Sequence, residues 1–269
     1  MVQNGSTPGR PLTLLVGVAV TVAGICAMRA PLLAAPLLVG AVGFRGFIAV
    51  SEVLLAVPGL LALGLRGAPL GQALALRPLS RRGIALCLGL GAVLWVASLG
   101  LLELQNVVWP VPPEYIAQFR HLHDLLRPRD PLDALLSLAT IALVPAVCEE
   151  TAIRGVLLPS LRTLVVPLPS IFLSAAVFSF MHLDLYRALF TFAVGLVLAA
   201  LRLRTQSLWP GLIAHATLNA LTFAAAPFID DPTGPLPDPR PLLGLALLAV
   251  GGYATALLWR HLEKPVDGV

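Results

Sequence analysis

Three short stretches in the second half of the chain place ionisable and polar side chains inside apolar sequence. They are Glu149-Glu150-Thr-Ala-Ile-Arg154, Phe178-Ser-Phe-Met-His182 and His215-Ala-Thr-Leu-Asn219. An unpaired charge inside a membrane costs on the order of 3 kcal/mol or more, so polar groups kept there are expected to have a function. Carboxylates, imidazoles and an amide together are the groups of a site that activates water for hydrolysis.

The spacing of the first stretch gives its charged residues different roles. On a helix, Glu150 and Arg154 are four residues apart and share a face, whereas Glu149 points about 100° away. We expect an ion pair between Glu150 and Arg154, with Glu149 free to face a cavity. A purely structural charge cluster is the alternative, but two carboxylates for one guanidinium leave an acid that such a cluster does not need.

The other two stretches supply imidazoles and an amide. His215 and Asn219 are also four residues apart, and an amide that donates a hydrogen bond without titrating suits the stabilisation of an oxyanion. His182 ends its apolar run, where a lone histidine often makes only a hydrogen bond between helices. Two nearby acids have no motif around them: we interpret Glu52 as a packing or pore-facing residue and Asp184 as part of an interfacial turn.

The composition predicts an integral membrane protein. Hydrophobic residues make up 58% of the chain and charged residues 12%, and the mean hydropathy is +0.89; a soluble domain has about 25% charged residues. The pI is near 9.4, but the arginines lie mostly at the ends of apolar runs. This pattern is typical of charge that flanks a lipid bilayer and excludes a nucleic-acid-binding face.

The apolar runs predict an all-α polytopic transmembrane bundle. By the length of about 20 apolar residues that one span needs, we expect about eight spans, with seven as the alternative: 11–28, 46–65, 83–103, 133–157, 169–182, 187–201, 207–228 and 241–259. Between the third and fourth, Tyr115 to Leu126 has an amphipathic pattern that favours a helix lying on the bilayer surface.

The basic residues predict the orientation. The loop 66–82 holds Arg66, Arg77, Arg81 and Arg82 and no acid, which favours a cytoplasmic position. Alternation of the spans then places both termini in the cytoplasm and the acidic loop 229–240 on the opposite side. The arginine- and alanine-rich composition suits a bacterial host, so we expect the protein in the cell membrane, the inner membrane of a bacterium.

At these residues the chain resembles the CPBP intramembrane proteases, also called the CAAX-protease or Abi, bacteriocin-processing family. The family is marked by EExxxR, FxxxH and HxxxN on successive membrane helices, which stand here at 149–154, 178–182 and 215–219. The resemblance runs from about residue 135 to 225. One departure is Thr151-Ala152-Ile153, where relatives commonly carry bulkier apolar residues.

The resemblance implies a glutamic-type intramembrane endopeptidase that acts on a membrane-tethered protein or peptide. It divides the chain into N-terminal transmembrane helices with an interfacial segment (1–132), a CPBP-like catalytic core (133–228), and a loop with a C-terminal transmembrane helix (229–269). Glu149 and His182 would activate the attacking water, and His215 with Asn219 would hold the oxyanion. No cofactor is expected, and three residues would support the catalytic groups: Glu150, Arg154 and Phe178.

Two alternatives stay open. A zinc-dependent metalloprotease could use Glu149, His182 and His215 as ligands with a bound water; against it, the chain has no HExxH motif, and Asn219 is a poor zinc ligand. A non-catalytic scaffold or transporter could use the polar groups for packing or ion passage. A transporter is expected to show repeated halves, and the sequence shows none.

Overall fold

The computed structural model describes residues 11–67, 69–229 and 238–262 of the chain. All regular secondary structure in these residues is helical, which confirms the predicted all-α class. The α-helices are α1 (Leu14–Arg29), α2 (Ala35–Leu65), α3 (Leu70–Ala73), α4 (Arg81–Val108), α5 (Pro113–Leu126), α6 (Pro131–Leu138), α7 (Val144–Glu150), α8 (Leu158–Leu161), α9 (Pro167–Phe180), α10 (Leu185–Thr205), α11 (Trp209–Ile229) and α12 (Pro241–His261). A 3₁₀ turn, Ala30–Ala34, links α1 to α2, and two π-helical segments, Ala139–Leu143 and Thr151–Leu157, join α6, α7 and α8.

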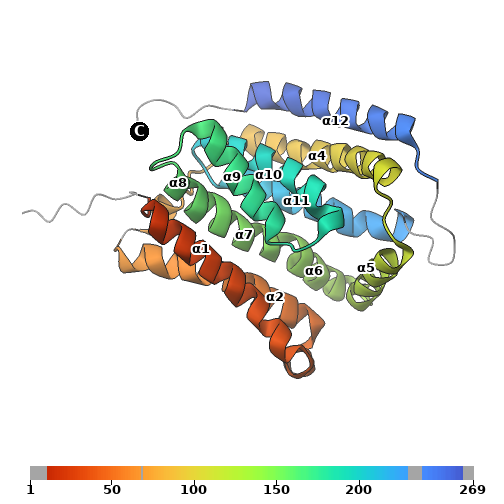
Figure 1. The fold of residues 1–269 in the computed structure, drawn as a ribbon, viewed down its shortest axis with the longest axis horizontal. Helices are drawn as coiled ribbons and strands as arrows, with labels where there is room; N and C mark the ends of the chain where they lie inside the picture. The colour runs from red at the N-terminus through yellow and green to blue at the C-terminus, as the bar shows by residue number, and fades with distance from the viewer. Residues whose placement is uncertain (1–10, 68, 230–237, 263–269) are drawn as a thin grey trace, which may run out of the picture.

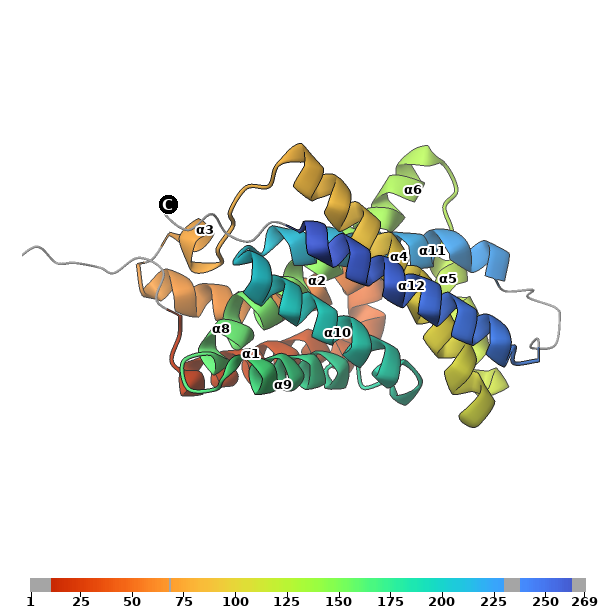
Figure 2. The same cartoon turned by 90° about the horizontal axis from the view of Figure 1, so that it is seen from above.

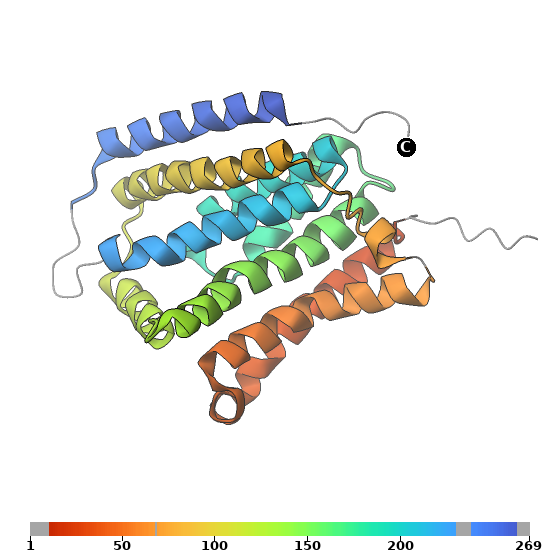
Figure 3. The same ribbon diagram turned by 180° about the vertical axis from the view of Figure 1, so that it is seen from behind.

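The long helices pack in two layers around one central helix. Figure 3 shows a row in which α12, α4, α11, the continuous helix from α6 to α8, and α2 follow one another. Helices α1, α9 and α10 lie on the other side of this row (Figures 1 and 2). The helix 131–161 therefore has neighbours in both layers, and every residue from Cys148 to Leu158 is buried.

The central helix is not α-helical throughout. Its two π segments each end two residues before a proline, Pro145 or Pro159. A proline has no backbone N–H and interrupts the α-helical hydrogen-bond ladder, and a π turn admits an additional residue at such a point. Glu149 and Glu150 lie between the two π segments, at the end of α7.

Five stretches of the described residues are long and apolar enough to cross a membrane: Leu14–Leu65, Arg81–Val108, Pro131–Leu161, Leu185–Thr205 and Pro241–His261. The first of these contains two helices, α1 and α2, which pack against each other (Figure 1). Helix α9, at 14 residues, is a shorter apolar helix. The protein is thus a multi-pass membrane protein, while the number of eight spans stays a prediction.

The paired helices α1 and α2, which we call the N-terminal hairpin, are tied to the central helix by an ion pair. Arg45 donates hydrogen bonds to both carboxylate oxygens of Asp133, at 2.6 and 3.0 Å, and a third to the Ser137 hydroxyl at 2.9 Å. Two residues before this arginine, α2 kinks at Gly43, where φ is 72° and ψ is 171°. Only glycine adopts this backbone conformation readily, so the kink depends on that residue.

Helix α5 lies beside the turn between α9 and α10. The Tyr115 hydroxyl donates a hydrogen bond of 2.5 Å to the Asp184 carboxylate, and burial together with this carboxylate raises the pKa of Tyr115 above its usual range. Asp184 also caps α10, because its other oxygen accepts from the backbone N–H groups of Tyr186 and Arg187. The interpretation of Asp184 as a turn residue is therefore confirmed.

Candidate active site

The predicted ion pair is present at the centre of the molecule. Arg154 Nη1 lies 2.8 Å from Glu150 Oε1, and neither side chain is exposed. The guanidinium also donates to the Gly195 carbonyl at 3.1 Å and lies over the Phe178 ring, 4.3 Å from its centroid. A buried ion pair is tolerated only when such additional contacts compensate for its lost hydration. These contacts connect the central helix to α9 and α10.

Helix α11 approaches the ion pair closely enough for a histidine to join it. His215 Nδ1 lies 3.1 Å from the same Glu150 oxygen that Arg154 binds. One turn before this histidine, Gly211 faces the second oxygen of Glu150, and a Cβ at that position would lie 2.9 Å from it. Because a side chain there would collide with the carboxylate, the glycine allows α11 to pack against Glu150.

His215 lies between the two adjacent glutamates. A carboxylate paired with a guanidinium is an acceptor, so Nδ1 of His215 carries the proton in its contact with Glu150. The other ring nitrogen, Nε2, lies 3.7 Å from Glu149 Oε2. The sequence placed His215 only on a shared face with Asn219. The structure adds that both of its nitrogens are directed toward carboxylates.

His182 lies in the turn that follows α9 and is half-buried. Its Nδ1 is 2.8 Å from the Phe178 carbonyl oxygen. A carbonyl only accepts hydrogen bonds, so Nδ1 is the protonated nitrogen, and Nε2 of the neutral ring is an acceptor. The structure therefore presents His182 in the tautomer that can bind a proton of water.

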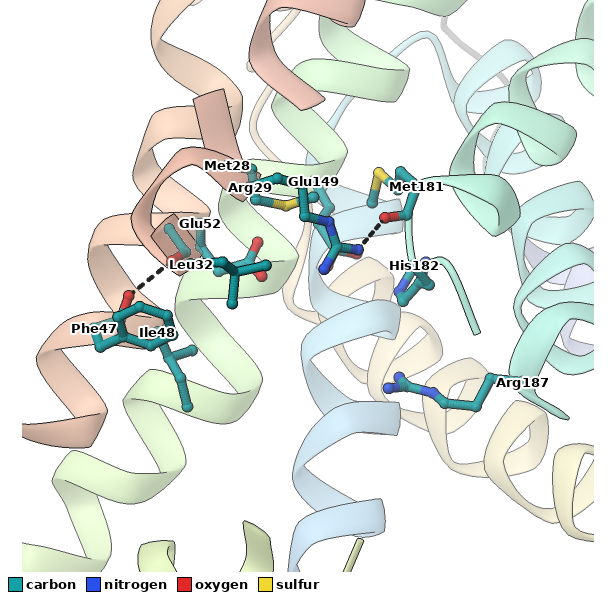
Figure 4. A pocket seen from close by; sticks show the side chains of 11 residues that line it. Met28, Arg29, Leu32, Phe47, Ile48, Glu52, Glu149, Met181, His182 and Arg187 are labelled. Atoms are coloured by element: carbon teal, nitrogen blue, oxygen red, sulfur yellow. Dashed lines mark hydrogen bonds between the residues drawn. The ribbon is translucent and has the colours of Figure 1, made fainter. Parts of the chain in front are cut away.

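Glu149 and His182 line one cavity of about 230 Å³ (Figure 4). A bilayer core is about 30 Å thick, and α9 has 14 residues, or about 21 Å at 1.5 Å per residue. Helix α9 ends at Phe180, and His182, in the turn after it, lines the cavity together with Glu149. The cavity is lined by Met28, Arg29, Leu32, Phe47, Ile48, Ser51, Glu52, Glu149, Met181, His182 and Arg187.

The structure places Asn219 outside the residues that line this cavity. It lies on α11, one turn after His215, and is half-buried. Neither residue lines the cavity, although His215 reaches Glu149. Among the described residues, the Asn219 side chain has no hydrogen-bond partner.

The comparison with protein families gives a match in the region that contains these residues. Residues 131–221 match the family model described as type II CAAX prenyl endopeptidase Rce1-like. The match covers 91 of the 269 residues and indicates the CPBP family, and we call this region the CAAX protease domain. The family indicates an intramembrane protease that acts on membrane-anchored protein substrates. No curated protein and no solved structure gave a significant match to the chain.

Seven of the eleven cavity residues come from the N-terminal hairpin and its linking turn, outside the matched CAAX protease domain. The sequence analysis interpreted Glu52 only as a packing or pore-facing residue and did not single out Arg29, and both line the cavity. Glu52 is an acid within a predicted span, which was a signal for a functional residue. Arg29 gave no such signal, because an arginine at a span end is typical of flanking charge; its guanidinium binds the Met181 carbonyl, one residue before His182.

The zinc alternative depends on how closely the three residues named for it are grouped. Tetrahedral zinc requires three protein ligands that converge at about 2.0–2.3 Å from the metal. In the part of the chain that the structure describes, no three His, Cys, Asp or Glu residues are grouped to hold a metal. The contact of His215 Nδ1 with Glu150 leaves Nε2, which lies 3.7 Å from Glu149 Oε2, as the nitrogen that could bind a metal, so the zinc alternative stays open.

Proposed function

We propose that the CAAX protease domain hydrolyses a peptide bond of a membrane-tethered protein or peptide with a water activated by Glu149 and His182, without a metal. The observation that carries the proposal is the placement of these two side chains on one cavity, although they come from different helices. Glu150, by contrast, is committed to Arg154. The adjacent glutamates therefore have different roles: Glu150 supports the site and Glu149 reacts.

The proposed reaction uses Glu149 as a general base and then as a general acid. Glu149 takes a proton from the water while the water oxygen bonds to the carbonyl carbon of the substrate. His182 Nε2 accepts a hydrogen bond from the same water and orients it. As the C–N bond breaks, the proton moves from Glu149 to the leaving nitrogen, so that an amine and a carboxylic acid are released.

The oxyanion that forms during this reaction requires hydrogen-bond donors. We assign this role to Asn219 and His215, which lie on one face of α11. The Asn219 amide donates at any pH, and His215 donates from Nε2 when that nitrogen is protonated. Glu150 holds the His215 ring in position through Nδ1, at 3.1 Å. Preorganised donors of this kind typically contribute a factor of about 10²–10³ each to turnover.

The proposal includes a location for the protein. It places the chain in the cell membrane, the inner membrane if the host is a bacterium, with both termini and the Arg77–Arg82 loop in the cytoplasm. The loop 229–240 would lie on the opposite side; most of it, 230–237, is outside the described residues. A reporter fused after residue 269 should be active in the cytoplasm, and activity only on the other side would contradict this orientation.

Cleavage assays with purified protein in liposomes test the function. Three internally quenched peptides of the same sequence would be compared: one anchored by a transmembrane helix, one anchored by an S-prenylated cysteine, and one without an anchor. We expect the wild-type protein to cleave an anchored peptide and not the free one, and the Glu149→Gln variant to cleave none. The two anchors distinguish a general membrane-tethered substrate from a prenylated one.

Two outcomes would replace the proposal. Loss of wild-type cleavage on addition of a chelator, with recovery on addition of zinc, would favour the zinc metalloprotease. Folded wild-type protein that cleaves none of a randomised anchored library would favour the non-catalytic scaffold or transporter. The fold of each variant would be checked by its melting temperature in detergent.

A further inference from the structure

Glu52 brings a third carboxylate to the candidate active site. It lies on α2, in the N-terminal hairpin, and lines the cavity together with Glu149 and His182 (Figure 4). It is 79 residues before the first residue of the matched CAAX protease domain, since that domain begins at 131. Nothing in the family motifs therefore gives it a role.

Each of the two carboxylates that face the cavity has an oxygen without a hydrogen-bond partner. Glu52 Oε2 and Glu149 Oε2 are both buried, and neither has a hydrogen-bond partner among the described residues. A buried oxygen that lacks a donor is costly, and the cost is larger for an ionised carboxylate. Two carboxylates on one small cavity meet this requirement together when they hold a single proton between them.

The surrounding charges define the electrostatic setting of this pair. Arg29 from α1, Arg187 from α10 and His182 from the turn before α10 face the same cavity. Arg29 binds the Met181 carbonyl, so its guanidinium is committed to the turn that carries His182. With both glutamates ionised and His182 neutral, the cavity would hold two negative charges beside two positive ones. With one proton shared, it keeps a net positive charge that favours the developing oxyanion.

We propose that Glu52 and Glu149 act as a carboxylate pair that holds one proton, in which Glu52 is the positioning residue and Glu149 the base. The inference rests on the proposed function. The protonated Glu52 carboxyl donates to the Glu149 carboxylate, keeps its reactive oxygen directed at the water, and prevents a second negative charge in the cavity. The N-terminal hairpin thus contributes a functional group to the reaction of the CAAX protease domain.

The active species in this scheme carries one proton on the pair, which determines the pH dependence. Protonation of both carboxylates removes the base, so activity falls on the acid side. Loss of the shared proton introduces the second charge, so activity also falls on the alkaline side. The Glu52→Gln variant keeps a hydrogen-bond donor that cannot ionise. We expect it to keep at least a tenth of the wild-type kcat at the optimum and to lose the alkaline fall.

The test is the kcat profile against pH for wild type, Glu52→Gln, Glu52→Ala and Glu52→Asp with the anchored quenched peptide. Glu52→Ala should lower kcat at least tenfold with a smaller change in KM, and Glu52→Asp should restore part of it together with the alkaline fall. Glu103→Gln is the matched control, because Glu103 pairs with Arg240 at 3.0 Å outside the cavity. It should match wild type. A wild-type kcat and profile in all Glu52 variants would overturn the inference while leaving the proposed function intact.

A second measurement does not depend on cleavage. The infrared band of protonated carboxyl groups would be followed against pH in wild type, Glu52→Gln and Glu149→Gln. A shared proton predicts two separated steps in wild type, and a single step between them in each variant. The pair would be contradicted if both carboxyls titrated at one pH in wild type and the remaining carboxyl of each variant titrated at that same pH. This outcome can be observed even if no substrate is cleaved.

Discussion

The Nδ1 atom of His182 lies 2.8 Å from the carbonyl oxygen of Phe178, four residues earlier. This contact holds the ring at the end of α9 and assigns its tautomer, because the carbonyl requires a donor. The same Phe178 side chain packs edge-on against the His182 ring, with centroids 5.1 Å apart. One residue therefore positions the histidine through both its backbone and its side chain.

The first prediction concerns this histidine. His182→Ala should lower the turnover of the anchored peptide by about 10²-fold, because the attacking water loses the acceptor that orients it. The melting temperature should stay close to that of wild type, because the ring is only half-buried. His261→Ala is the control: His261 is exposed at the end of α12. Unchanged turnover in His182→Ala would remove His182 from the site.

The second prediction concerns the buried ion pair. Glu150→Gln leaves Arg154 as a buried charge with a weaker partner, and removal of one partner of such a pair typically costs about 3–5 kcal/mol. We expect a clear fall in the melting temperature and in turnover together. Glu149→Gln should instead abolish turnover with little change in melting temperature, because Glu149 is not paired with Arg154.

A double replacement separates stability from catalysis at the same pair. Apolar residues of similar volume often replace a buried ion pair without loss of stability. Glu150→Leu combined with Arg154→Met should therefore melt above Glu150→Gln. Turnover should stay low, because His215 has lost the carboxylate that orients Nδ1. Full activity in the double variant would show that the ion pair has no part in positioning His215.

The third prediction tests the amide on α11. Asn219→Ala should lower kcat by about 10²–10³-fold, the usual loss for one oxyanion donor. KM should change less, because the oxyanion forms only during the reaction. Thr222→Ala is a suitable control, since Thr222 is exposed on the same helix and bonds the Leu218 carbonyl. An effect on KM alone would instead assign Asn219 to substrate binding.

The fourth prediction tests how α11 meets Glu150. In Gly211→Ala the added methyl group would lie 2.9 Å from Glu150 Oε2 and must displace the carboxylate or the helix. We expect lower turnover and a lower melting temperature, because the displaced carboxylate or helix changes the position of His215. Gly252→Ala on α12 is the matched control, because no described atom outside its immediate neighbours lies within 4 Å of the added Cβ. Wild-type behaviour of Gly211→Ala would mean that this packing is not needed.

The fifth prediction concerns metal. Purified wild-type protein should contain far less than one zinc per chain by elemental analysis, and a chelator should leave cleavage of the anchored peptide unchanged. This expectation is supported by the described part of the chain, in which no three His, Cys, Asp or Glu residues are grouped to hold a metal. One zinc per chain that is lost in His182→Ala and His215→Ala would establish the metalloprotease alternative.

The sequence predicted the parts of the site that depend on local spacing. The pairing of Glu150 with Arg154 follows from four residues on one helix, and the freedom of Glu149 follows from the angle between adjacent residues. The all-α class followed from the length and composition of the apolar runs. The information for the ion pair lies within about two helical turns, and that for the fold class lies within single apolar runs of about 20 residues.

The remaining features depend on contacts between distant segments. Nothing near Glu52 indicates that α2 packs beside α7, and the role of Arg29 depends on a carbonyl 152 residues away. The π segments were also missed, because apolar periodicity does not distinguish a π turn from an α turn over five to seven residues. The predicted span 169–182 has the same 14 residues as α9, but α9 begins and ends two residues earlier, so His182 lies in the turn after the helix and lines the cavity from there.

The π segment Ala139–Leu143 has a consequence for the angle between two parts of one helix. It separates Asp133, which binds Arg45 of the N-terminal hairpin, from Glu149, which faces the cavity. Removing one residue to restore a plain α turn would rotate one part against the other by about 100°. Either the link to Arg45 or the direction of Glu149 would then be lost. The π turn therefore sets the angle around the helix axis between Asp133 and Glu149. With it, Asp133 faces Arg45 while Glu149 faces the cavity.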